Sequence, residues 1–208
     1  MRPGPVSRPS FQLQPRRSAG RTERRVYLVM VSLVLGGARS GKSRFALGLG
    51  ADSARAVYIA TGRVEDMEMA ARVAKHRRER PGNWITIEEP LEIANAAERH
   101  SSDFDFLLVD CLTLWLSNFC WEHRQDPEPA VEAAALREVA RVMTNPTRAR
   151  IVLVTNEVGC GIVPETSVGR FFRDLQGRVN QESARLADEV FHMVAGIPIE
   201  IKHPERCR

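Results

Sequence analysis

The stretch Leu33–Ser43, "LVLGGARSGKS", joins an apolar run to a glycine-rich turn that ends in Gly-Lys-Ser. Its spacing, Gly, four residues, Gly-Lys-Ser, is typical of a phosphate-binding loop between a β-strand and an α-helix. The glycines let successive N–H groups face one anion, and the start of the helix adds further free donors. The stretch therefore predicts a nucleotide site with these contact residues: Gly36, Gly37, Ala38, Arg39, Ser40, Gly41, Lys42 and Ser43.

Two residues of this loop are expected to have distinct roles. Lys42 would reach the outer phosphates, and the hydroxyl of Ser43 would bind the Mg²⁺ that accompanies the nucleotide. A second magnesium ligand is expected where a buried strand ends, and the run "DFLLVD" ends in Asp110. An aspartate there can also cap the following helix, and the two roles can coexist.

Apolar runs and helix-like segments alternate along the chain. Runs such as "FLLVD" and "IVLVT" are continuous, as expected for strands buried on both faces of a parallel sheet. The alternation predicts an α/β fold, a doubly wound, mostly parallel sheet flanked by helices in one RecA-like P-loop domain. The expected strands are Val26–Leu35, Val57–Ala60, Trp84–Glu88, Phe106–Asp110, Ile151–Thr155, Glu189–Val194 and Pro198–Lys202. The expected helices are Gly41–Gly50, Val64–Arg78, Leu91–Arg99, Leu112–Glu122, Pro129–Met143 and Val168–Ala187.

The last helix carries an apolar stripe, which we expect to face the core. Its members recur at helical spacing: Val168, Phe172, Leu175, Val179 and Leu186. The three tryptophans, Trp84, Trp115 and Trp121, are also expected in the core rather than on a ligand platform.

Residues 1–29 differ in composition from the rest of the chain. They are rich in Pro, Arg and Ser and poor in apolar residues, so we expect them to be disordered. An Arg-rich, acid-poor head also resembles a mitochondrial presequence. Because Met30 directly precedes "VSLVLGGARSGKS", a misassigned start site is a third alternative. The predicted organisation is a head at 1–29, one domain at 30–202 and a tail at 203–208.

The formal net charge of +4 does not indicate a nucleic-acid-binding surface. Seven arginines and one glutamate give residues 1–29 a charge of +6, so the remaining 179 residues carry −2. No apolar run reaches the roughly 18 residues that span a bilayer, so we expect no membrane span. The four cysteines lack the spacing of a zinc site or a disulfide framework, which favours free thiols in the cytoplasm, and the remaining histidines show no ligand spacing that would predict a structural metal.

Five stretches together resemble one family, the bifunctional adenosylcobinamide kinase/adenosylcobinamide-phosphate guanylyltransferases of cobalamin biosynthesis. They are "GGARSGKSRFA" (36–46), "YIATG" (58–62), "EMAARVAKHRRERPGNWITIEEP" (68–90), "LVDCLTLWLSN" (108–118) and "VTNEVGCGIVPETSVGRFFRDLQGRVNQESARLADEV" (154–190). The resemblance implies phosphorylation of adenosylcobinamide by ATP or GTP, then transfer of GMP from GTP to adenosylcobinamide phosphate. It also implies a homotrimer.

The resemblance implies site residues as well. His76 matches the histidine that becomes guanylylated, and a neutral imidazole is nucleophilic near pH 7. Further matches to nucleotide contacts are Ala60, Thr61, Gly62, Arg77, Arg78, Glu79, Arg80, Glu88 and Asp110. Asn156 and Glu157, at the end of another strand, could face the corrinoid or a phosphate, or could only cap a loop.

Two rival functions stay open from the residues alone. One is a P-loop kinase without nucleotidyl transfer. The other is a RecA-like ATPase or nucleotide-sensing switch that acts on nucleic acid or on a protein. The negative charge after residue 29 weighs against nucleic acid.

Overall fold

The computed structural model describes residues 30–63, 81–100 and 104–204 of the 208-residue chain. In these residues seven strands form one sheet in the order β3-β2-β4-β5-β1-β6-β7. The first six strands of that order are parallel, and β7 is antiparallel to β6. Their bounds are β1 Val31–Gly36, β2 Ala56–Ala60, β3 Ile85–Glu88, β4 Phe106–Asp110, β5 Arg150–Asn156, β6 Glu189–Val194 and β7 Ile197–Lys202. The predicted mostly parallel α/β sheet is confirmed.

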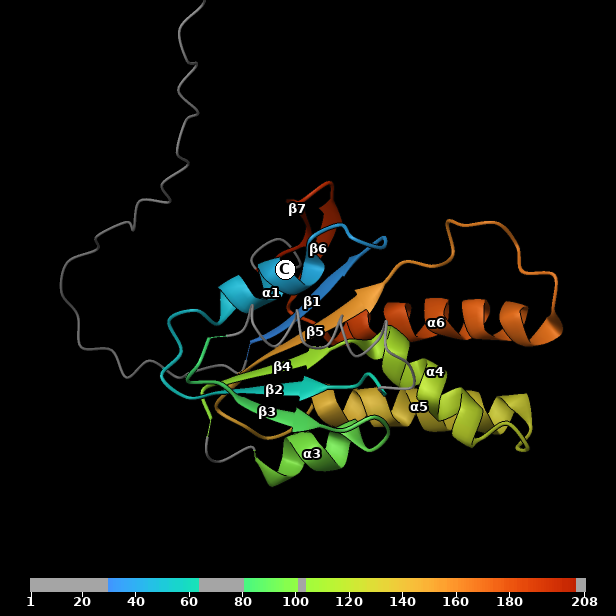
Figure 1. Ribbon diagram of the computed structural model, residues 1–208, viewed down its shortest axis with the longest axis horizontal. Coiled ribbons are helices and arrows are strands. Elements are labelled where there is room, and N and C mark those ends of the chain that lie inside the picture. Colours follow the sequence, from blue (N-terminus) through green and yellow to red (C-terminus); the bar gives the residue numbers. More distant parts are fainter. Residues whose placement is uncertain (1–29, 64–80, 101–103, 205–208) are drawn as a thin grey trace, which may run out of the picture.

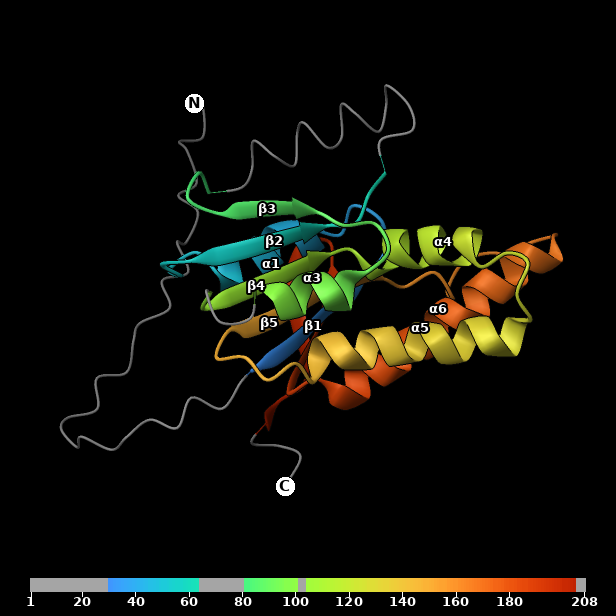
Figure 2. The same ribbon diagram turned by 90° about the horizontal axis from the view of Figure 1, so that it is seen from below.

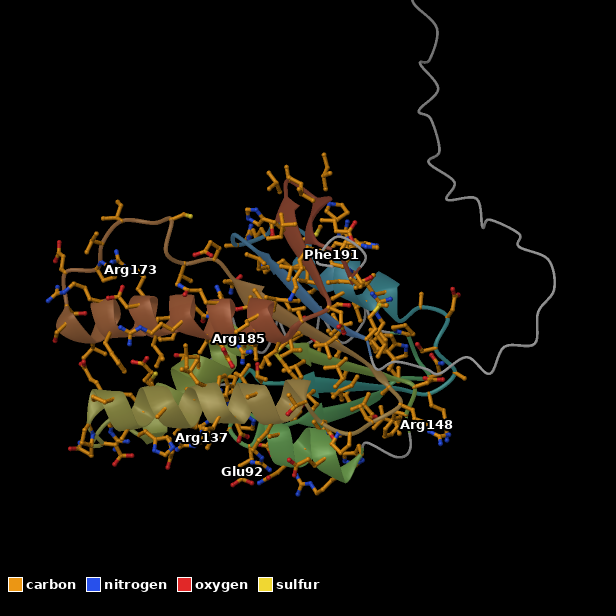
Figure 3. All side chains as sticks on the ribbon, turned by 180° about the vertical axis from the view of Figure 1, so that it is seen from behind. Glu92, Arg137, Arg148, Arg173, Arg185 and Phe191 are labelled. Carbon is orange, nitrogen blue, oxygen red and sulfur yellow. The ribbon has the colours of Figure 1, made fainter. Side chains whose placement is uncertain are left out.

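Helices cover both faces of the sheet (Figure 1). One face packs against α3 (Ile93–Arg99), α4 (Leu112–Glu122), α5 (Glu128–Met143) and α6 (Ser167–Leu186). This is the face seen from below in Figure 2. The other face packs against α1 (Lys42–Leu49), where Phe45 meets Phe191 of β6 edge-on with ring centroids 5.0 Å apart. Phe191 is labelled in Figure 3. Side chains alternate along each strand, so every central strand contributes to both cores.

The predicted elements fall on the observed ones, with ends that differ by at most two residues where the structure describes them. The start of the first predicted strand, residues 26–29, and the predicted helix Val64–Arg78 lie outside the described residues. The helix predicted from Leu91 begins at Ile93, because the Glu89 carboxylate accepts hydrogen bonds from the N–H groups of Leu91 and Glu92. Those donors are satisfied before the helix starts.

Two expectations about buried residues were wrong. Val168 is 75% exposed, because it lies in the first turn of α6, which extends past the sheet (Figure 1); Phe171 and Phe172, one turn later, pack against the core. Trp121 is 65% exposed at the end of α4, where the Arg124 guanidinium lies 4.9 Å from its ring centroid. Trp84 and Trp115 are buried as expected, and the indole N–H of Trp115 donates to the Leu91 carbonyl at 2.8 Å.

None of the helices in the described ranges is long and apolar enough to cross a membrane.

Candidate functional site

The phosphate-binding loop connects β1 to α1 at the carboxyl edge of the sheet. Its backbone has positive φ angles at Gly36 (151°), Arg39 (56°) and Gly41 (96°). Gly41 directly precedes α1 and has no side chain to cap it, so the first N–H groups of the helix are left for a ligand. A phosphate at the start of α1 would accept those hydrogen bonds and meet the positive end of the helix dipole.

The β6–β7 hairpin supports this loop from one side. The Gly196 N–H donates to the Ser40 carbonyl at 3.0 Å. A Cβ added at Gly36 would lie 2.6 Å from the Met193 carbonyl oxygen, closer than atoms can approach. Gly36 is therefore required both by its φ angle and by the close approach of β6.

Lys42 is a buried cation at the centre of the loop. Its side chain is 7% exposed, and its ammonium donates to the Gly37 carbonyl at 2.6 Å. Burial lowers the pKa of Lys42, while the nearby Cys111 and the Asp110 carboxylate oppose that shift. Within the described residues no carboxylate lies within ion-pair distance of the ammonium. The site thus holds a desolvated positive charge that a bound phosphate would neutralise.

Asp110 ends β4 on the face of the sheet that α1 covers. The Tyr58 hydroxyl on β2 donates to its Oδ2 at 2.8 Å, and Tyr58 is 3% exposed. The Oδ1 atom of Asp110 has no hydrogen-bond partner among the described residues, so it can accept a bond from a magnesium-bound water. Tyr58 was missed by sequence reasoning, although it lies two residues before Ala60 on the same strand face.

The chemistry of Ser43 and Asp110 fits Mg²⁺. Ser43, in the first turn of α1, is partly exposed and offers a hydroxyl, and Asp110 offers a carboxylate; both are hard oxygen donors. The part of the chain that the structure describes has no cluster of three or more His, Cys, Asp or Glu that could hold a metal. At nucleotides, magnesium is usually held by one or two protein oxygens together with phosphate oxygens and water.

The predicted contacts on β2 and β3 lie at this same edge. Ala60 pairs with Asp110 on one side and with Glu88 on the other, and Glu88 is exposed. Thr61 is fully buried; its hydroxyl donates to the Cys111 carbonyl at 2.7 Å and accepts from the Cys111 N–H at 2.9 Å. The Thr61 side chain therefore ties the end of β2 to the end of β4. Its main chain is bound as well, since its N–H donates to the Asp110 carbonyl at 3.4 Å and its carbonyl accepts from the Asn118 side-chain NH₂ at 2.8 Å, so the nucleotide contact predicted at Thr61 stays a prediction.

His76, Arg77, Arg78, Glu79 and Arg80 lie outside the described residues, so their predicted roles stay predictions. Glu157 accepts a hydrogen bond from the Gly159 N–H at 2.9 Å, which supports its reading as a loop cap. Asn156 ends β5 beside Gly36. The structure thus brings the phosphate loop, Ala60, Thr61, Glu88, Asp110 and Asn156 to one edge of the sheet.

Comparison with known proteins agrees with this arrangement. Residues 32–201 match the family model described as cobinamide kinase / cobinamide phosphate guanyltransferase. The "Bifunctional adenosylcobalamin biosynthesis protein CobU" of Escherichia coli K12 is 42% identical over 181 residues, which cover 83% of this chain and 100% of that protein. The "Bifunctional adenosylcobalamin biosynthesis protein CobP" of Pseudomonas aeruginosa PAO1 is 43% identical over 177 residues, covering 83% and 98%.

A solved structure of an ATPase from a type III secretion system superposes with a TM-score of 0.48 at 11% identity, over 78% of this chain and 50% of that one. That likeness is too distant to add to the topology described above. The family match covers most of the sheet and all the motifs at its carboxyl edge. The chain belongs to the cobinamide kinase / cobinamide phosphate guanyltransferase family.

Proposed function

We propose that this bifunctional enzyme phosphorylates adenosylcobinamide with ATP or GTP, and then transfers GMP from GTP to adenosylcobinamide phosphate through a guanylylated His76. Membership of the family supports the two reactions. The observation that supports nucleotide binding is the burial of Lys42. This cation lies on the phosphate loop, and among the described residues no carboxylate neutralises it.

In the kinase step the loop positions the outer phosphates of the nucleotide. The ammonium of Lys42 moves from the Gly37 carbonyl to phosphate oxygens, and the N–H groups at the start of α1 bind the same anion. The hydroxyl of the substrate's aminopropanol arm attacks the γ-phosphorus, and the nucleoside diphosphate leaves. Ser43 and Asp110 would hold Mg²⁺, which when bound neutralises charge on the transferring phosphoryl group.

In the second step His76 acts as the nucleophile. A neutral ring nitrogen attacks the α-phosphorus of GTP, an N–P bond forms, and pyrophosphate leaves. A phosphate oxygen of adenosylcobinamide phosphate then attacks the same phosphorus, which gives adenosylcobinamide-GDP and free His76. Arg77, Arg78 and Arg80 are close in sequence and would stabilise the leaving pyrophosphate. A carboxylate such as Glu88 could accept hydrogen bonds from N1 and N2 of guanine, which would favour GTP over ATP.

Labelled GTP tests this function. Protein incubated with Mg²⁺ and α-labelled GTP should become covalently labelled, with a bond that is labile in acid and stable in alkali, whereas γ-labelled GTP should leave no label. His76→Ala should abolish the label, and His100→Ala, outside the motifs, should retain it. Nucleotide binding without covalent label would instead favour an ATPase or switch, and label in His76→Ala would place the nucleophile elsewhere.

The assembly and compartment are part of the same proposal. Resemblance to the family supports a homotrimer, which light scattering of the purified chain would test. Cys111, Cys120 and Cys160 are free thiols, which suits the reducing cytoplasm.

A further inference from the structure

Asn156, the last residue of β5, lies beside the phosphate loop, and its side-chain amide is available to bind a ligand. It pairs with Gly36, the first glycine of the loop, and the next residue continues the contact, since the Glu157 N–H donates to the Gly36 carbonyl at 3.1 Å. Side chains alternate along β5: Thr155 faces α6, so Asn156 faces the side of the sheet that carries α1 and Asp110. Its side-chain amide is partly exposed and has no hydrogen-bond partner among the described residues.

The main chain of Asn156, in contrast, is bound on both sides. Its N–H donates to the Thr113 hydroxyl of α4 at 2.9 Å. Its carbonyl accepts from the Asn180 side-chain NH₂ of α6 at 3.0 Å. Two helices that pack on the far face of the sheet therefore fix the backbone from which the free amide projects.

The orientation of Asn180 is itself determined by a buried network. Its Oδ1 accepts from the Thr155 hydroxyl at 2.7 Å and from the Gln176 NH₂ at 2.9 Å. Because two donors occupy that oxygen, the NH₂ group of Asn180 must face the Asn156 carbonyl. Thr155 and Gln176 are fully buried, and Asn180 is 8% exposed.

This network is not what a stable core alone requires. The Gln176 Oε1 is buried without a hydrogen-bond partner in the described structure, and an unsatisfied buried acceptor costs stability. Apolar side chains at these positions would fill the same space without that cost. A polar network kept at such a cost, directly beneath an active-site strand end, indicates a role in positioning.

We propose that the side-chain amide of Asn156 donates a hydrogen bond to the terminal phosphate of the nucleotide seated on the loop, and that Asn180, oriented by Thr155 and Gln176, is its positioning residue. The inference rests on the proposed nucleotide site but not on the identity of the acceptor substrate. A phosphate is the group expected there, because Asn156 pairs with the first residue of the phosphate loop.

The test compares binding of a non-hydrolysable GTP analogue with binding of GDP, by calorimetry in the presence of Mg²⁺. Asn156→Ala should weaken the triphosphate analogue about tenfold, as expected for loss of one hydrogen bond to a charged group, and should change GDP affinity less than about twofold. Equal weakening of both nucleotides, or no change in either, would overturn the phosphate contact.

The positioning role is tested by Asn180→Leu, alone and combined with Asn156→Ala. The single variant should weaken the triphosphate analogue about threefold to tenfold, and the double variant should be no weaker than Asn156→Ala, because Asn180 acts only through Asn156. Additive losses would contradict this. Thr155→Val, which removes one donor to Asn180 and keeps the shape, serves in the same comparison if Asn180→Leu does not fold.

Ser183 provides a matched control on the same helix. It is fully buried, and its hydroxyl has no hydrogen-bond partner in the described structure. Ser183→Ala should leave the affinities for the triphosphate analogue and for GDP unchanged. A loss of affinity equal to that of Asn180→Leu would mean that Asn180 acts through packing and not through its hydrogen bond to Asn156. Failure of the proposed function would be seen in a different experiment. The wild-type protein would then carry no covalent GMP, even though the Asn156 and Asn180 variants changed nucleotide affinity as expected.

Discussion

The two ends of the sheet differ in whether a positively charged side chain has an acidic partner. At the carboxyl edge, Lys42 is 7% exposed and its ammonium is bound only to neutral oxygens of the loop in the described structure. At the amino edge, Arg150 begins β5, and its side chain crosses β1 to reach β6, where its Nη2 is 2.6 Å from the Glu189 carboxylate. The Ser32 hydroxyl donates to that carboxylate at 2.8 Å and accepts from Arg150 at 3.1 Å.

This difference separates a structural charge from a functional one. The Arg150 charge is neutralised by the fold itself, so that end of the sheet needs no ligand. The Lys42 charge is desolvated but not neutralised, and that end is completed only when an anion binds. Arg150 begins the parallel strand β5, whereas Lys42 begins the helix that follows β1, at the carboxyl edge where parallel sheets carry their ligand sites.

The largest effect is expected from Lys42→Met. Loss of the cation should lower both the kinase and the guanylyl-transfer rates at least about a hundredfold, since one preorganised donor to the reacting phosphates is removed. The thermal midpoint should not fall, because burial already disfavours the charged lysine, as its lowered pKa indicates. Arg44→Ala, on the exposed side of α1, is the control and should keep activity within about twofold. Full activity of Lys42→Met would show that the Lys42 charge is not needed for nucleotide binding, which would contradict the difference between the two edges.

An intermediate effect is expected at the amino edge. Glu189→Gln leaves Arg150 without its anion and should lower the free energy of unfolding by about 1–3 kcal/mol, with no change in activity per folded molecule. Denaturant titration measures this.

Glu182→Gln is the control for that variant. Its partner Arg185 on α6 (labelled in Figure 3) has a side chain that is 66% exposed, so the change should cost less than about 1 kcal/mol. Equal stability of the two glutamine variants would mean that Arg150 is no more dependent on its partner than a surface arginine.

The smallest effect is expected from Tyr58→Phe, which keeps the ring and removes one hydrogen bond to Asp110. We expect about a threefold to tenfold loss of kinase rate and a higher Mg²⁺ concentration for half-maximal rate, from the loss of about 1 kcal/mol of orientation at the carboxylate. Magnesium titration of both proteins checks this. An unchanged magnesium dependence would show that Asp110 needs no such support.

Much of the fold could be predicted because buried strands in a parallel sheet are continuous apolar runs with polar ends. β4 and α4 were predicted with the observed ends, since "FLLVD" is bounded by Asp110 and a helical pattern follows at once. Trp121 was misplaced, because side-chain type favours burial but only packing determines whether a helix end has a neighbour.

The candidate site was predicted in part. The phosphate loop is a local motif, readable from eight consecutive residues. Tyr58 and Asn180 were missed because each binds a residue of a different element: Tyr58 on β2 binds Asp110 of β4, 52 residues away, and Asn180 on α6 binds Asn156 of β5, 24 residues away. One signal was present in α6: Gln176, Asn180 and Ser183 recur at helical spacing, as a buried polar face does.

The sequence by itself determined the phosphate loop, the order of strands and helices, and the family. Those depend on local spacing and on side-chain type, which adjacent residues carry. Only the tertiary structure decided which charge is neutralised and which is left for a ligand, and which polar side chains support Asn156 and Asp110. Those depend on hydrogen bonds between distant strands and helices, and register and packing set such distances only after the sheet has formed.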